Sequence, residues 1–351
     1  MKQRDLFWDN VKGILIFLVV LGHFLYSYAN KIPDSMAAHI YIFIYSFHMP
    51  AFIFCSGYFS RSERARGSEA LIKLVLCYLA FNTAMMLFSH FYLGSSIKTL
   101  TPYFSYWYLL SMLAWRFLIG KLGKVKGILV LSVLISLAMG YCNEFPNMLS
   151  IRRTVAFFPF FVAGYLLDPE KVAGLLKRRT PRSMIVSAAA VLAVAAVAFW
   201  AVVRFKLTGS ATLMGSYNAT GTIFHRLLIF AISAAAIAGM FLVVPNCQIP
   251  LLTRSGRYSL LIYLVHRFIT IFYYKEIFPA KTYTRIYLLY ALIATVAVCW
   301  AFSRRPLNRL FITTLDRAAA AVDQGTKAGK WIIGLILLGF LGSLILRGIT
   351  A

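Results

Sequence analysis

The feature that most constrains this chain is a series of apolar runs, each close to the length that crosses a membrane. In the first run, residues 13–21 carry no polar side chain. A membrane-spanning helix needs about 20 predominantly apolar residues. The runs lie near 8–27, 38–59, 70–92, 103–120, 126–142, 151–168, 183–204, 222–244, 257–275, 284–302 and 331–348. This pattern predicts an all-α, polytopic transmembrane helical bundle with about ten to eleven spans.

Composition supports a membrane protein and excludes several other classes. Of the 351 residues, 60% are hydrophobic and only 13% are charged, whereas soluble domains are about 25% charged. The net charge of +25 resides mostly in short loops between apolar runs, where basic residues meet anionic lipid, so we expect a bilayer partner and no nucleic acid. The five cysteines show no CxxC spacing, and we expect neither a metal site nor a disulfide framework.

The loop charges predict the orientation of the chain. Lys and Arg concentrate in alternate loops, and cytoplasmic loops carry the excess of these residues. The basic loops are those at 61–66, 121–126, 171–182, 254–257 and 304–309. This alternation predicts a cytoplasmic N-terminus and, with eleven spans, a C-terminus on the opposite side. We divide the chain into a transmembrane domain over 1–310 and, over 311–351, a cytoplasmic linker or surface helix followed by an extra span.

Ionisable residues bracket the first apolar run. Lys12 and His23 are eleven positions apart, so on a helix they share one face and lie about 16 Å apart along the axis. Asp9 precedes Lys12 by three residues, which is the spacing of an intrahelical ion pair. Two interpretations remain open. Both residues sit at the membrane interfaces, or both face a cavity, as ionisable residues within membrane helices usually do.

A second apolar stretch adds a distinctive pattern. It reads Phe-His48-Met-Pro-Ala-Phe-Ile-Phe-Cys-Ser-Gly-Tyr-Phe and is followed at once by a basic loop from Arg61 to Arg66. Together, Asp-x-x-Lys-Gly, the apolar run ending in Gly-His, Phe-His-Met-Pro and Ser-Gly-Tyr-Phe resemble the acyltransferase-3 family, and within it the fucose 4-O-acetylase-like subgroup. The resemblance runs from about residue 5 to residue 270. It implies an integral membrane O-acyltransferase that modifies carbohydrates.

The resemblance also implies roles for basic residues. The family marks its first helix with a basic residue, often arginine, ten residues before a histidine, and this chain has Lys12 there. Lysine keeps the charge but lacks the planar fork of arginine. Arg61 and Arg64 match the family's cytoplasmic Arg-x-x-Arg element, where guanidinium groups suit the phosphates of coenzyme A. The alternative is that these arginines only set topology.

Transfer of an acyl group to a hydroxyl needs a base for the alcohol and a stabiliser for the oxyanion. We expect His23 to be the base, because histidine titrates near neutral pH, with support from Asp9 or His48. His48 lies in the middle of the second run, just before Pro50, and a proline is tolerated there where a helix lines a cavity. An interhelical hydrogen bond is the alternative role for His48.

Further stretches fit the family pattern and supply candidate substrate-binding residues. Trp107 opens an aromatic helix like the family's fourth helix, although alone it would indicate an interfacial aromatic belt. Arg152 and Arg153 open an apolar span on the external side, where a sugar acceptor or the transferred acyl group meets them; interface anchoring is the alternative. Tyr263 lies in Ser-Leu-Leu-Ile-Tyr-Leu-Val-His266, which resembles a late family motif, and His266 is expected to be more structural than catalytic.

Two functions from different classes follow. The first is an acyltransferase in the bacterial cytoplasmic (inner) membrane, with acetyl-CoA as co-substrate, a glycan hydroxyl as acceptor and exopolysaccharide synthesis or export machinery as a partner. The second is a transporter or flippase for glycans or lipid-linked sugars. Transporters commonly show paired halves with broken helices in corresponding positions, and this sequence shows none. The enzyme is therefore the favoured prediction.

Overall fold

The computed structural model describes residues 5–32, 34–98, 100–142, 148–205, 207, 213, 215–217, 221–277, 286–327, 329 and 331. Within these residues the fold is helical and has no strand. The helices are α1 (Leu6–Lys31), α2 (Met36–Phe59), α3 (Glu63–Arg66), α4 (Ser68–Leu93), α5 (Trp107–Leu122), α6 (Ile128–Ala138), η1 (Met139–Tyr141), η2 (Met148–Ser150), α7 (Ile151–Leu166), α8 (Pro169–Lys177), α9 (Pro181–Arg204), α12 (Ile223–Val243), α13 (Pro250–Arg257), α14 (Ser259–Phe272), η3 (Tyr273–Ile277), α15 (Tyr287–Phe302) and α16 (Arg305–Asp323). The all-α polytopic bundle that the sequence predicts is confirmed.

Helix ends follow local sequence signals. Asp5 caps α1 by accepting from the backbone N–H groups of Phe7 and Trp8, at 3.1 and 3.4 Å. Thr180 and Ser183 form a reciprocal capping box at the start of α9. Gly94 ends α4 in the left-handed conformation, with φ of 66°. These caps satisfy backbone groups at helix ends, where the chain turns back into the bundle.

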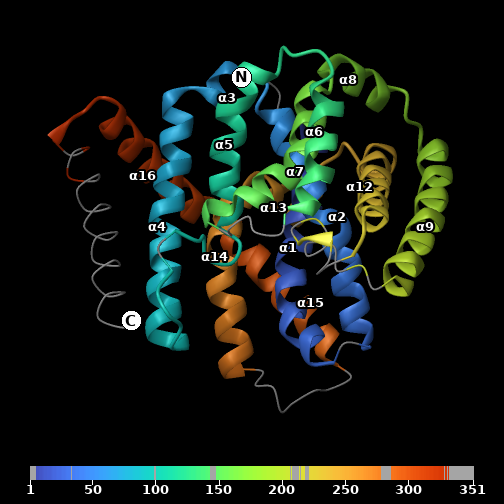
Figure 1. Ribbon diagram of the computed structural model, residues 1–351, viewed down its shortest axis with the longest axis horizontal. Helices are drawn as coiled ribbons and strands as arrows, with labels where there is room; N and C mark the ends of the chain where they lie inside the picture. Colours follow the sequence, from blue (N-terminus) through green and yellow to red (C-terminus); the bar gives the residue numbers. More distant parts are fainter. Residues whose placement is uncertain are drawn as a thin grey trace.

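The helix α1 is the centre of the bundle and contacts α2, α13, α14 and α15 (Figure 1). The helices α2 and α7 pack closely, because each contributes a glycine at the crossing. A Cβ on Gly57 would overlap the carbonyl oxygen of Phe161, and one on Gly164 would overlap that of Phe54. Small residues let membrane helices approach closely in this way. The outer helix α9 is mostly exposed and faces the surroundings of the bundle.

Fewer helices than expected are long enough to span a membrane alone. Among the described residues, five helices pass by length and composition, namely α1, α2, α4, α9 and α12, and a sixth if α15 and α16, bent by 59°, count as one span. The predicted span 257–275 contains the 14-residue α14, and the predicted span 126–142 contains the 11-residue α6. Sixteen-residue helices such as α5, α7 and α15 are about 24 Å long, short of the roughly 30 Å hydrocarbon core.

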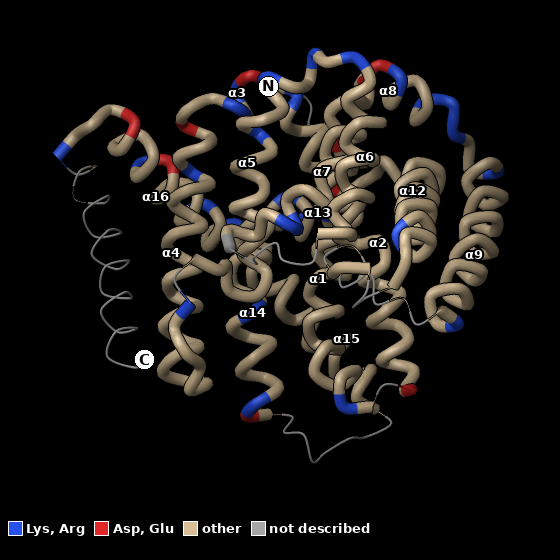
Figure 2. Tube along the Cα trace, in the orientation of Figure 1, with Lys and Arg blue, Asp and Glu red and all other residues tan. Residues whose placement is uncertain are grey.

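Charge is distributed unevenly along the bundle axis. Lys and Arg gather at the end that carries α3 and α8, and few lie at the opposite end (Figure 2). The positive-inside rule assigns the basic end, with the start of α1, to the cytoplasm. The predicted linker 311–330 overlaps α16, which packs against α4 and pairs Asp316 with Lys73 at 2.7 Å. The predicted last span, 331–348, lies outside the described residues apart from Trp331.

Candidate functional site

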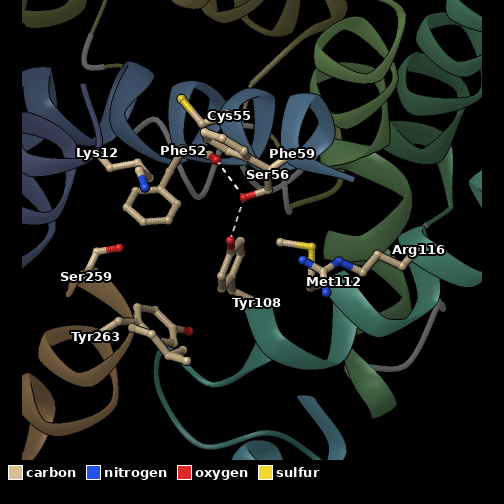
Figure 3. A pocket seen from close by; sticks show the side chains of 11 residues that line it. Lys12, Phe52, Cys55, Ser56, Phe59, Tyr108, Met112, Arg116, Ser259 and Tyr263 are labelled. Carbon is tan, nitrogen blue, oxygen red and sulfur yellow. Dashed lines mark hydrogen bonds between the residues drawn. The ribbon is translucent and has the colours of Figure 1, made fainter. Parts of the chain in front are cut away.

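A cavity of about 170 Å³ lies between α1, α2, α5 and α14. Figure 3 shows Lys12 and Arg116 on opposite sides of it, with Ser56 and Tyr108 between them and Tyr263 below Lys12. None of the described residues that line the cavity is acidic. The space is therefore lined by cations, aromatic rings and hydroxyl groups, which suits an anionic ligand with an apolar portion.

Lys12 is held at the cavity wall by Asp9. Its Nζ lies 3.0 Å from the Asp9 carboxylate and 5.0 Å from the ring centroid of Phe59. The predicted ion pair across one helical turn is confirmed. The sequence did not reveal that Arg257 of α13 also approaches this carboxylate, with Nε 3.5 Å from Asp9 Oδ2. Asp9 is thus shared between two cations at the cytoplasmic end of α1.

Arg116 is the second cation of the cavity, and it was not among the residues singled out in the sequence. Its Nε donates to the hydroxyl of Ser60 at 3.2 Å. A neutral hydroxyl does not compensate the charge of a guanidinium, whose other N–H groups suit an anion. The signal that sequence reasoning passed over is an arginine directly after Trp115 within an apolar helix, because charges in such helices are rarely incidental.

Hydroxyl groups of α2, α5 and α14 are already engaged in hydrogen bonds. Ser56 donates to the carbonyl of Phe52 at 2.8 Å, so Tyr108 is the donor in its 2.6 Å bond to Ser56. Tyr263 donates to the carbonyl of Ser105. These bonds fix the cavity walls, and they engage the proton of the Ser56 hydroxyl with the Phe52 carbonyl.

A second cluster lies about 16 Å further along α1, around His23. Its Nδ1 is 3.0 Å from the hydroxyl of Tyr45 and 3.3 Å from NH1 of Arg267. The His266 ring lies with its centroid 5.1 Å from that of His23. Tyr263 links the two regions, because it lines the cavity and its ring centroid is 5.8 Å from that of His266. Lys12 and His23 therefore belong to two polar clusters that both adjoin Tyr263 or its neighbour His266.

The structure does not place Asp9 beside His23, contrary to the expectation from the sequence. Fourteen residues separate them on one helix, which is about 21 Å, so Asp9 cannot contact the imidazole. Tyr45 and Arg267 hold His23 instead, and neither was singled out in the sequence. An arginine directly after His266 in an apolar helix was the available signal.

His48 is buried in α2 and directed back to its own helix. Its Nδ1 lies 2.7 Å from the carbonyl oxygen of Ile44, and its ring centroid is 4.7 Å from that of Tyr45. His48 therefore reaches the His23 cluster through Tyr45. A direct role of His48 toward substrate stays a prediction.

The arginines of the basic loop lie at the cytoplasmic surface rather than in the cavity. Arg61 donates to the carbonyl of Leu167, while Arg64 is exposed on α3. Arg66, which was not proposed as a site residue, lies over the Tyr165 ring at 5.8 Å and donates to the carbonyl of Arg61 at 3.3 Å. The α3 segment also contacts α5, the helix of Arg116. A phosphate site at Arg61 and Arg64 stays a prediction.

The expected substrate-binding residues form one local group and one separate residue. The Arg153 guanidinium lies 5.4 Å from the Trp107 ring centroid, and Tyr263 belongs to the adjoining cavity wall. Arg152 instead donates to the carbonyl of Cys142 at 2.6 Å. Trp107 is buried against Phe157, which makes it a packing residue as well.

The family model for an acyltransferase domain matches residues 5–304. The chain belongs to the acyltransferase-3 family. Its apolar helices are those of a multi-pass membrane protein.

Two curated relatives share parts of the chain. The nodulation protein NolL of Sinorhizobium fredii is 34% identical over 184 residues, which cover 47% of this chain and 49% of the relative. NolL of Mesorhizobium japonicum is 43% identical over 68 residues, or 19% of this chain and 18% of the relative. The chain thus spans about half or less of the length of these relatives. No solved structure matches.

Proposed function

We propose that this acyltransferase-3 protein transfers an acetyl group from acetyl-CoA to a hydroxyl of a cell-envelope or exported glycan, in the bacterial cytoplasmic membrane. The observation that carries the proposal is the placement of Lys12 and His23 on one face of α1, each in a separate polar cluster. One cluster lies toward the basic end of the bundle and the other lies deeper. An enzyme that joins a cytoplasmic donor to an exported acceptor needs such a pair of sites.

The donor side is the cavity of Lys12 and Arg116. Its cations and lack of described acidic lining residues suit a phosphate group, and its aromatic walls suit the pantetheine arm. Arg64 lies in α3, which contacts α5, and Arg61 directly precedes α3; both would meet the nucleotide portion of the donor. The donor would enter from the basic end and extend its thioester toward Tyr263 and the histidine cluster.

The acceptor side is the cluster around His23. Acyl transfer needs a proton acceptor for the hydroxyl and donors for the oxyanion that forms on the acyl carbonyl. The imidazoles of His23, His48 and His266 and the guanidinium of Arg267 supply both kinds of group. Arg153 and Trp107 lie together beside the cavity wall at Tyr263 and are the proposed contacts of the sugar, because a cation over an aromatic ring suits a polyhydroxyl ligand.

The test is an assay with labelled acetyl-CoA on the protein purified in detergent and reconstituted with glycan acceptors. We expect the wild type to release CoA and to label the acceptor, and His23→Ala to lose about 10²- to 10⁴-fold in transfer rate. His39→Ala, at the start of α2, is the matched control and retains activity. If the wild type consumes neither acetyl-CoA nor another acyl-CoA, the proposal fails and a carrier of glycans becomes the leading function.

A further inference from the structure

Hydrogen-bond partners define which nitrogen of His266 carries its proton. Nδ1 lies 2.6 Å from the carbonyl oxygen of Tyr263 and 3.2 Å from that of Ile262. A carbonyl oxygen only accepts, so Nδ1 must carry the hydrogen. In the neutral ring Nε2 then bears a free lone pair. This nitrogen is buried and has no hydrogen-bond partner among the described residues.

The partners of His23 lead to the opposite tautomer. Arg267 approaches Nδ1 of His23 at 3.3 Å, and a guanidinium has only N–H donors. Nδ1 must therefore be the acceptor, and the proton of the neutral ring lies on Nε2. The Tyr45 hydroxyl at 3.0 Å approaches the same nitrogen. His23 thus presents an N–H group, while its own lone pair is occupied.

We propose that His266, rather than His23, accepts the proton of the acceptor hydroxyl, and that His23 donates its Nε2–H to the oxyanion. The two rings, with centroids 5.1 Å apart and tilted by 32°, combine one free lone pair with one N–H. His266 is fully buried whereas the side chain of His23 is partly exposed, so a ligand approaches the cluster from the side of His23. This inference rests on the proposed acyl transfer and assigns its base.

These side chains account for every proton that moves in the transfer. The acceptor R–OH gives its proton to Nε2 of His266, and its oxygen forms a bond to the carbonyl carbon of the acyl thioester. The carbonyl oxygen becomes an oxyanion that receives the N–H of His23, with Arg267 beside it. The C–S bond then breaks, and the thiolate leaves and takes the proton from the His266 imidazolium. The products are the O-acyl ester and free coenzyme A.

His48 is the competing base because it has the same tautomer. Its Nδ1 donates to the Ile44 carbonyl at 2.7 Å, which leaves Nε2 without the proton. The His48 ring packs against the ring of Tyr45, whereas the His266 ring packs against the ring of His23. The geometry therefore favours His266, and a His48→Gln variant separates the two.

The first measurement is the tautomer of each ring. ¹⁵N-histidine labelling of the full chain gives six imidazoles, and each is assigned by its own His→Gln variant. We expect the ¹⁵N shifts to show Nδ1–H for His266 and Nε2–H for His23. The opposite assignment for either ring overturns the inference, and this readout needs no acyl transfer.

The second measurement is acyl transfer by glutamine variants, because a carboxamide N–H₂ reaches the place of Nε2 but cannot act as a base. We expect His266→Gln to lose about 10²- to 10⁴-fold. His23→Gln should retain more activity than His23→Ala, since it still offers a donor. His90→Gln is the control, because His90 has the same Nδ1-to-carbonyl pairing, with Ser95 at 3.1 Å, at the end of α4.

The outcomes separate the two proposals. His266→Gln at the wild-type rate, or His48→Gln alone as the inactive variant, overturns the His266 assignment while acyl transfer stands. A wild type that transfers no acyl group from any acyl-CoA overturns the proposed function, and the proton transfer assigned to His266 falls with it. A His266→Gln protein that elutes and melts like the wild type excludes misfolding as the cause of lost activity.

Discussion

The Asp9 carboxylate and the Arg257 guanidinium join α1 to α13, with Nε 3.5 Å from Oδ2, while Lys12 lies 3.0 Å from the other carboxylate oxygen. Asp9 is only 2% exposed. Its removal leaves two cations close together with no carboxylate between them. A buried pair broken on one side typically costs about 3–5 kcal/mol.

We therefore expect Asp9→Asn to lower the free energy of unfolding by roughly 3 kcal/mol. The measurement is the apparent melting temperature in detergent, followed by size-exclusion chromatography. Glu69→Gln is the control, since Glu69 pairs with Lys73 at the surface, where such pairs contribute at most about 1 kcal/mol. Equal melting temperatures for Asp9→Asn and the wild type would contradict the buried pair.

The close crossing of α2 and α7 depends on Gly57. We expect Gly57→Ala to destabilise the fold by roughly 1–3 kcal/mol, because the added methyl meets the Phe161 carbonyl and forces the helices apart. Gly174→Ala is the same substitution in α8, where nothing lies within 4 Å of the new Cβ. That control should melt at or above the wild-type temperature, since alanine favours a helix. Similar melting of both variants would count against close α2–α7 packing.

Local features of the sequence predicted the parts of the site that lie on one helix. The Asp9–Lys12 pair and the shared face of Lys12 and His23 follow from helical spacing alone. The partners of His23 do not, because Arg267 is 244 residues away and contacts it only after α14 packs on α1. Local periodicity carries no information on such long-range contacts.

Several predicted spans contain helices shorter than a membrane crossing, for a related reason. The apolar run from 257 to 275 contains no proline or glycine, yet α14 covers only Ser259–Phe272 of it. Buried helices in a bundle need no membrane-length run, since protein rather than lipid surrounds them. Arg116 was not predicted as a site residue because an arginine near a helix end also fits a topology signal.

Orientation is testable with the native cysteines. Cys142, after α6, and Cys247, between α12 and α13, are both exposed. With a cytoplasmic N-terminus, we expect an impermeant maleimide to label Cys142 in intact cells and Cys247 only after permeabilisation. Cys142→Ser and Cys247→Ser assign the label to each site by mass spectrometry. Labelling of Cys247 in intact cells would reverse the orientation and place the Lys12 cavity on the wrong side for a cytoplasmic donor.

The last prediction concerns Arg116 and the donor. We expect Arg116→Gln to raise the KM for acyl-CoA about 10- to 100-fold with little change in kcat, because hydrogen bonds to a charged group are worth about 1.5–3 kcal/mol. Arg116→Lys should have a KM between those of the wild type and Arg116→Gln, since lysine keeps the charge but lacks the planar guanidinium fork. Lys121→Gln removes one charge from the same helix outside the cavity and is the control. A lower kcat at unchanged KM in Arg116→Gln would instead assign Arg116 to the reaction step. Equal effects of Arg116→Gln and Lys121→Gln would mean that the donor senses only the charge of the cytoplasmic face.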